Sequence, residues 1–195
     1  MRRTVRLALG ALVVFVSSAA LAQNSTELYP LKKDTKWVYK VGETTITVKV
    51  TAADASGATL ETLVNDKAVA SEVIQVKADG VYRTKINKAD INPPVKILEL
   101  KDGKAVAKGA KWDVKSKIQD QEVKGTFSVK DDAEKVKVPA GEYTTIVVDG
   151  PDFEIAGTKT GVKYWFAPKA GIVKLTYNIA GNEAVLELKE YTEGK

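Results

Sequence analysis

The sequence predicts an all-β protein: an antiparallel meander that forms a curved half-barrel, a barrel or a two-sheet sandwich, with little or no helix. Residues 23–195 contain 21 Val, 10 Ile and 16 Thr but only 9 Leu, and β-branched residues favour strands over helices. Apolar residues alternate with Lys and Thr along several segments, which gives each strand one apolar and one polar face. Without a helix to cover it, such a sheet must curl on itself.

In the N-terminal half, we expect strands at 36–41, 44–53, 58–64, 69–77, 81–87 and 95–100. The segment 44–53 shows clear two-residue alternation, which is the period of a half-buried strand. Asn65-Asp66-Lys67 and Asp79-Gly80 are turn sequences that separate neighbouring strands. The segment 65–77 also fits a helical stripe, but the flanking turns favour a hairpin arm.

In the C-terminal half, we expect strands at 111–118, 122–130, 134–138, 143–149, 161–167, 172–179 and 183–191. Residues Tyr143 to Val148 are apolar on both faces, which predicts a central strand covered on both sides. Asn92-Pro93-Pro94 interrupts strand pairing because proline has no N–H to donate. Residues 23–195 therefore form one β domain, or two β halves that meet near residues 92–94.

Residues 1–22 have the features of a cleaved signal peptide. Three arginines precede an apolar run from Leu7 to Val16, and Ala20-Leu21-Ala22 matches the pattern before a cleavage site, with Gln23 as the new N-terminus. A membrane anchor is the alternative, but the apolar run is shorter than the ~20 residues that a spanning helix needs. We therefore expect an exported protein, periplasmic or extracellular and soluble, with no transmembrane segment after cleavage.

The composition excludes several classes of function. The chain has no Cys and no His, so it has no disulfides, no thiol nucleophile and no imidazole base. The absence of Cys also predicts that it is not a lipoprotein. Its net charge is +5, but residues 23–195 hold 27 basic and 25 acidic residues, too even a balance for a nucleic-acid partner. We expect no cofactor, no metal site and no catalytic residue.

The candidate ligand or partner contacts are aromatic residues and the one arginine beyond the leader. They are Trp37, Tyr39, Tyr82, Arg83, Trp112, Tyr164, Trp165 and Phe166. Consecutive strand residues point to opposite faces, so Tyr164 and Phe166 share one face and Trp165 takes the other. These aromatics fill a hairpin core or form a platform for a ligand. Arg83 forms a structural ion pair or anchors a carboxylate or phosphate.

Several motifs in this order resemble a family of exported, β-rich bacterial proteins of uncharacterised function, called TapB-like. They are Lys36-Trp37-Val38-Tyr39, Asp79-Gly80-Val81-Tyr82-Arg83, Pro93-Pro94, Trp112, Val138-Pro139-Ala140-Gly141-Glu142-Tyr143, Tyr164-Trp165-Phe166-Ala167-Pro168 and Gly171-Ile172-Val173-Lys174. Lys169 departs from the resemblance, which implies glycine there. Such proteins are similar in shape to the half-barrels of lipoprotein-localisation factors, which bind acyl chains on a concave apolar face.

These observations predict an exported, non-catalytic envelope protein that binds a hydrophobic small molecule, such as a lipid, or a peptide on its curved sheet. A structural or interaction module with a filled core, which recruits an envelope protein through an edge strand, is the first alternative. A hydrolase that uses only carboxylates is the second. Its candidate acids cluster around Asp149, Asp152 and Glu154 and around Asp131, Asp132 and Glu134.

Overall fold

The computed structural model describes residues 27–195, so the expected leader at residues 1–22 lies outside the described residues. Apart from a helical turn at residues 27–28, the regular structure is β. The strands are β1 (Lys36–Val41), β2 (Thr44–Asp54), β3 (Gly57–Val64), β4 (Lys67–Lys77), β5 (Gly80–Ile86), β6 (Ala89–Lys101), β7 (Lys104–Ala105), β8 (Lys111–Ile118), β9 (Gln121–Val138), β10 (Gly141–Ile155), β11 (Thr158–Ala167), β12 (Gly171–Ile179) and β13 (Asn182–Thr192).

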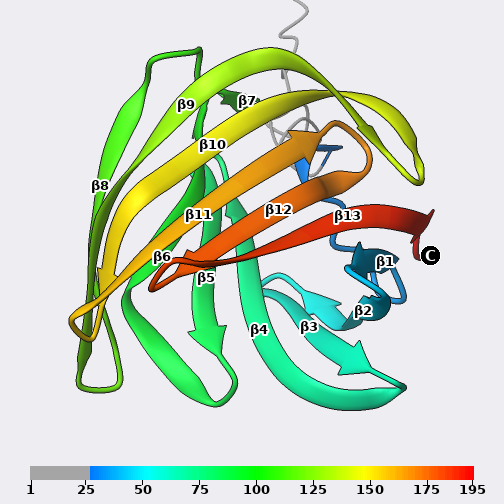
Figure 1. Ribbon diagram of the computed structural model, residues 1–195, viewed down its shortest axis with the longest axis horizontal. Coiled ribbons are helices and arrows are strands. Elements are labelled where there is room, and N and C mark those ends of the chain that lie inside the picture. Colours follow the sequence, from blue (N-terminus) through cyan, green and yellow to red (C-terminus); the bar gives the residue numbers. More distant parts are fainter. Residues whose placement is uncertain (1–26) are drawn as a thin grey trace, which may run out of the picture.

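The strands form a closed antiparallel barrel. Their order is β5-β4-β3-β2-β1-β13-β12-β11-β10-β9-β8-β6, and β6 pairs again with β5, which closes the ring. The short strand β7 pairs only with the end of β6. Figure 1 shows strands β8–β13 as one curved wall that faces β4–β6. The predicted all-β class is confirmed, and the barrel is the observed form among the three expected ones.

Most of the expected strands correspond to an observed strand. At one end or both, the expected and observed boundaries agree to within a residue or two. The segments expected at 122–130 and 134–138 are a single long strand, β9, and β7 is not among the expected strands. Residues 65–77 are a turn followed by β4, as the flanking turn residues predicted. Asn65 and Asp66 have φ of 49° and 59°, the left-handed conformation that tight hairpin turns require.

The closure between β6 and β8 is the weakest seam of the barrel in backbone hydrogen bonds. Only Ile91 and Asn92 of β6 pair with β8, opposite Ile118 and Lys117. Beyond the prolines, side chains replace the ladder: Ser116 Oγ donates to the Pro93 carbonyl at 2.5 Å and Trp112 Nε1 donates to the Lys96 carbonyl at 2.8 Å. The Pro-Pro sequence thus interrupts pairing as predicted, inside strand β6.

The core lies inside the barrel, where alternate residues of each strand point. Phe127 is 2% exposed, and its ring lies 4.6 Å from Phe153 and 6.0 Å from Tyr164 between centroids. Glycines make room for these rings: a Cβ on Gly125 would lie 2.6 Å from the Phe153 ring, and one on Gly150 would overlap both phenylalanine rings. The two glycines are therefore packing requirements of the aromatic core.

Replacing Lys169 with glycine is expected to stabilise the protein by about 0.5–1 kcal/mol. Lys169 has φ of 65° in the turn between β11 and β12, a conformation that strains a residue with a Cβ and suits glycine. Greater freedom of glycine in the unfolded chain offsets part of this gain. Urea unfolding of the Lys169→Gly variant, compared with that of the Lys169→Ala variant, measures this gain in stability. A stability equal to that of the alanine variant would contradict the strain.

Candidate functional site

The inner surface of the barrel divides into a filled half and an open half. In the filled half, Tyr29 packs against Trp37 at 5.8 Å and against Phe166 at 6.3 Å between ring centroids. Trp37 Nε1 donates to the carbonyl of Ala170 at 2.6 Å. Because aromatic rings with satisfied polar atoms pack densely, this half is packed core.

Two such bonds fasten strand β1 to the turn between β11 and β12 and to the start of β12. Besides Trp37, Tyr39 donates its hydroxyl to the Ile172 carbonyl at 2.7 Å. Both side chains are buried and both reach past β13, which separates β1 from β12 in the sheet. These two candidate residues therefore hold the wall in shape, and Tyr39 forms the boundary of the open half.

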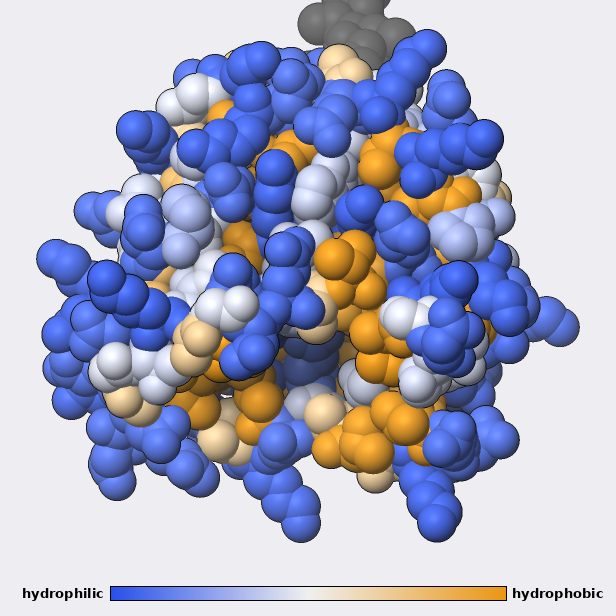
Figure 2. Space-filling view, viewed as in Figure 1, coloured by the Kyte–Doolittle hydropathy of each residue, from blue (hydrophilic) through white to orange (hydrophobic). Residues whose placement is uncertain are grey.

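The open half is lined by inward-facing residues that keep partial exposure. By register they share a face with buried core residues, yet each is only half-buried: Ile46, Val48, Thr62, Ala70, Val162, Tyr177 and Leu186. Ile179, at the rim, is 52% exposed. Figure 2 shows a hollow at this place, with apolar residues around it and a hydrophilic floor. The barrel thus has an apolar-walled lumen open at one end.

A charged pair lies at the boundary between the two halves. Arg83 on β5 donates from Nε to Glu72 Oε2 on β4 at 2.6 Å. Arg83 pairs in register with Ile74, and Glu72 pairs with Leu60, and both partners are fully buried inside the barrel. The side chains of Arg83 and Glu72 are 17% and 23% exposed. Because both point inward, this exposure faces the lumen.

Tyrosine side chains surround the pair. Burial raises the pKa of the Tyr39 phenol, and the Glu72 carboxylate raises it further. Burial also raises the pKa of the Tyr177 phenol, as does Tyr164, whereas Arg83 lowers it. Burial alone would lower the pKa of the Arg83 guanidinium, but the charge of Glu72, the phenols of Tyr164 and Tyr177 and the hydrogen bond to Glu72 together outweigh it, and the pKa lies well above its ordinary value. The Arg83–Glu72 ion pair therefore lies beside phenols whose pKa values are raised.

The stability of the protein is expected to fall as the pH rises above about 10. The pKa values of Tyr29, Tyr39 and Tyr177 are raised in the folded state, chiefly by burial. In the unfolded chain these phenols ionise near pH 10, so alkali stabilises the unfolded state first. Urea unfolding across this pH range measures the loss, and phenolate absorbance of the native protein follows the ionisation. A flat stability profile above that pH would contradict the burial.

The sequence-predicted residues divide between the two faces of the barrel. Arg83 belongs to the ion pair in the lumen, and Tyr39 and Tyr164 lie beside that pair. Trp37 and Phe166 lie in the filled half. The outer face holds Tyr82 and Trp165, and Trp112 closes the seam with β6. Trp112 also faces inward, 5.6 Å from Phe127 between ring centroids, so the structure brings six of the eight candidates inside the barrel.

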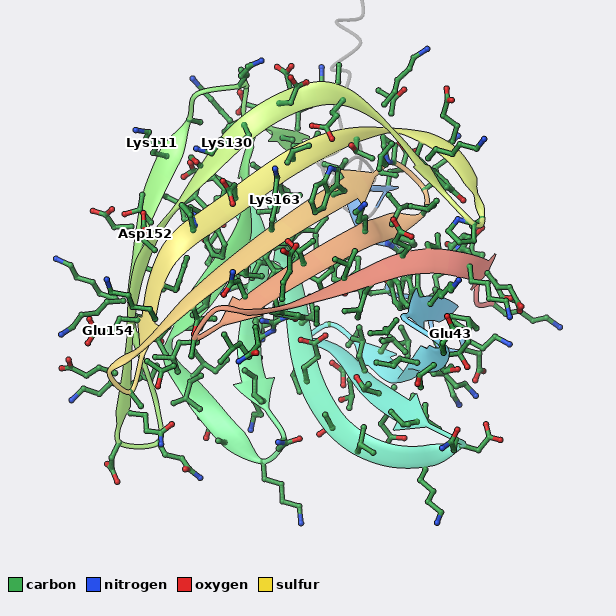
Figure 3. All side chains as sticks on the ribbon, viewed as in Figure 1. Glu43, Lys111, Lys130, Asp152, Glu154 and Lys163 are labelled. Atoms are coloured by element: carbon green, nitrogen blue, oxygen red, sulfur yellow. The ribbon has the colours of Figure 1, made fainter. Side chains whose placement is uncertain are left out.

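Trp165 is built into the outer wall. Its Nε1 donates to Glu134 Oε1 at 2.9 Å, and the Nζ atoms of Lys163 and Lys174 lie 5.0 and 5.6 Å from its ring centroid. Figure 3 shows Lys163 on the outer side of β11. Because lysines and a carboxylate cover the ring, Trp165 is 7% exposed and does not form an open platform.

The two carboxylate clusters lie on the outer surface. Figure 3 shows Asp152 and Glu154 at the outside of the barrel. Asp131 accepts from Lys108 Nζ at 3.0 Å, and Glu134 is the partner of Trp165. Within residues 27–195, no group of three or more Asp or Glu side chains is arranged to hold a metal ion. In the same part of the chain, no helix has the length and apolar character needed to cross a membrane.

Sequence reasoning missed Glu72 and Tyr177 as site residues. Tyr177 lies in a clearly alternating strand, and its position on the apolar face was a usable signal. Glu72 lies in Ala70-Ser71-Glu72-Val73, where the alternation is weak, so its face follows only from pairing with Leu60. A carboxylate on the same face as Ile74 is the signal that points to an interior ion pair.

Solved structures share this fold at low sequence identity. A candidate lipoprotein from Parabacteroides distasonis is 13% identical with a TM-score of 0.55, over 85% of this chain and 98% of that one. A candidate exported protein from Bacteroides fragilis, described as having a YmcC-like fold, is 13% identical with a TM-score of 0.56, over 84% of this chain and 98% of that one. No protein-family model and no curated protein matches the chain. The resemblance to exported, β-rich bacterial proteins is thus confirmed at the level of the fold.

Proposed function

We propose that the protein is an exported, non-catalytic β-barrel of the cell envelope that holds an apolar or amphipathic ligand in the open half of its lumen. The observation that carries the proposal is the hollow with half-exposed apolar walls beside a densely packed aromatic half. Apolar side chains that face an opening inside a barrel are stabilised when a ligand removes them from water. The barrel supplies a rigid wall for such a ligand.

Export is supported by the leader-like residues 1–22 and by the fold shared with a candidate exported protein. One structural neighbour is named as a candidate lipoprotein, whereas the chain contains no Cys to carry a lipid. We therefore propose a periplasmic or extracellular protein without lipid attachment. A single β domain at residues 23–195 is part of the same proposal.

The two alternatives make different demands on the lumen. An interaction module with a filled core needs packed side chains throughout, which the aromatic half has and the open half lacks. A carboxylate-based hydrolase needs two carboxyl groups about 5–9.5 Å apart across a cleft. Glu72, which faces the lumen, is paired with Arg83 instead. Both observations favour ligand binding.

The proposal is tested by extracting the purified native protein with organic solvent and by titrating it with an environment-sensitive naphthalene dye. We expect a co-purified lipid or saturable dye binding. Ala70→Trp fills the lumen beside Thr62, and Thr176→Trp adds the same ring to the outer face of β12. The first is expected to abolish dye binding and the second to leave it unchanged. No lipid and no saturable dye binding, or equal effects of the two variants, would refute the proposal.

A further inference from the structure

We infer that the ligand of the lumen is an amphiphile with an uncharged, hydrogen-bonding head group, such as a hydroxyl or an amide, which binds at the Glu72–Arg83 pair. This inference rests on the proposed ligand-binding function and adds the chemical class of the ligand. It follows from where the pair lies, which hydrogen-bonding groups it leaves free, and the charge balance of the lumen.

The pair lies where the apolar wall meets the filled core. Along β4, Glu72 stands between fully buried Ile74 and half-buried Ala70. Along β5, Arg83 follows fully buried Val81 on the inner face. A molecule that enters the open end therefore meets the pair only at full depth. Its polar group must go in first, and its apolar chain then lies against the wall up to the rim.

The pair offers both donors and acceptors to a ligand. A guanidinium has five N–H groups and a carboxylate has two acceptor oxygens, and the bond to Glu72 engages Nε of Arg83 and Oε2 of Glu72. Arg83 also hydrogen-bonds the Tyr177 phenol, and the two side chains as a whole keep 17% and 23% exposure toward the lumen. A hydroxyl or an amide both donates and accepts, so it can satisfy both members of the pair. An alkyl group there would leave them dehydrated and unpaired.

The charge of the lumen is already balanced. Glu72 and Arg83 are the charged side chains that act on the pKa values of Tyr29, Tyr39 and Tyr177. Burial keeps these phenols neutral, so the site has one positive and one negative charge. An anionic or cationic head group would add an uncompensated charge in a partly dehydrated cavity, which is costly. A neutral polar group adds none.

The test compares decanol, decanesulfonate and decylamine, which share one alkyl chain, as competitors of the naphthalene dye on the full chain at neutral pH. Decanol is expected to bind at least about tenfold more tightly than either ion. Glu72→Gln leaves a net positive charge and is expected to shift the preference to decanesulfonate. Arg83→Gln leaves a net negative charge and is expected to shift it to decylamine.

The matched control is Glu187→Gln. Glu187 forms a similar ion pair with Lys174 at 2.9 Å, but on the outer face of the barrel, so this variant is expected to keep the preference of the natural protein. Circular dichroism verifies the fold of each variant. The head-group preference of the natural protein is measured on the natural protein itself, so it does not depend on whether the variants fold. Equal binding of the three compounds overturns the head-group inference and leaves lumen binding intact. Failure of the dye and all three compounds to bind overturns the proposed function itself.

Discussion

Replacing Phe127 with alanine is expected to lower the free energy of unfolding by about 3–5 kcal/mol. Phe127 is the centre of the aromatic core: its ring lies 4.6 Å from Phe153, 5.6 Å from Trp112 and 6.0 Å from Tyr164 between centroids. Removing it leaves a cavity lined by rings that are anchored on three other strands, β8, β10 and β11. The wall cannot collapse to fill this cavity because its strands are held by hydrogen bonds to their neighbours.

Urea unfolding followed by circular dichroism measures this loss. Phe127→Leu keeps most of the volume and is expected to cost less than half as much. Val185→Ala, on the outer face at 36% exposure, is the control and is expected to change stability by no more than about 0.5 kcal/mol. If Phe127→Ala cost no more than Val185→Ala, the filled half of the barrel would be loosely packed.

The strands were predictable because burial in a sheet is a local, two-residue pattern. In β8, Trp112, Val114 and Ser116 turn inward between exposed lysines and an aspartate, and this pattern needs no knowledge of the strand's neighbours. Turn chemistry is equally local, as Asn65 and Asp66 show. Closure of the barrel is different, because the pairing of β5 with β6 and of β6 with β8 depends on the curvature accumulated over the whole sheet.

The candidate site was predictable only in part. Arg83 was expected to form a structural ion pair or to anchor a ligand, and the structure shows the ion pair, but its partner Glu72 depends on the register between β3 and β4. Tyr82 was grouped with Arg83 because the two are adjacent in sequence. Adjacent strand residues face opposite sides, so Tyr82 lies outside, within 5.0 Å of Lys77. The residue types suited to a functional site were thus recognisable from the sequence. The face of the sheet on which each one lies could be assigned only from the strand pairing.

The ion pair itself gives the second large effect: Arg83→Met is expected to cost about 2–4 kcal/mol of folding stability. The substitution keeps much of the apolar volume of the side chain but leaves the Glu72 carboxylate facing the lumen without its counter-charge. The partial exposure of the pair, 17% for Arg83 and 23% for Glu72, lets water reach the carboxylate. The loss is therefore expected at or below the 3–5 kcal/mol typical of a fully buried broken pair.

A double variant separates the loss of the pair from the loss of packing. In Arg83→Met with Glu72→Leu no charge remains in the lumen, and replacement of an interior ion pair by apolar groups is often neutral. We therefore expect the double variant to regain stability to within about 1 kcal/mol of the natural protein. The outer pair is the comparison, since Lys174→Met exposes Glu187 to bulk water and is expected to cost less than about 1 kcal/mol. Equal losses for Arg83→Met and the double variant would mean that the pair acts through packing alone, and its charges could not then select the head group of a ligand.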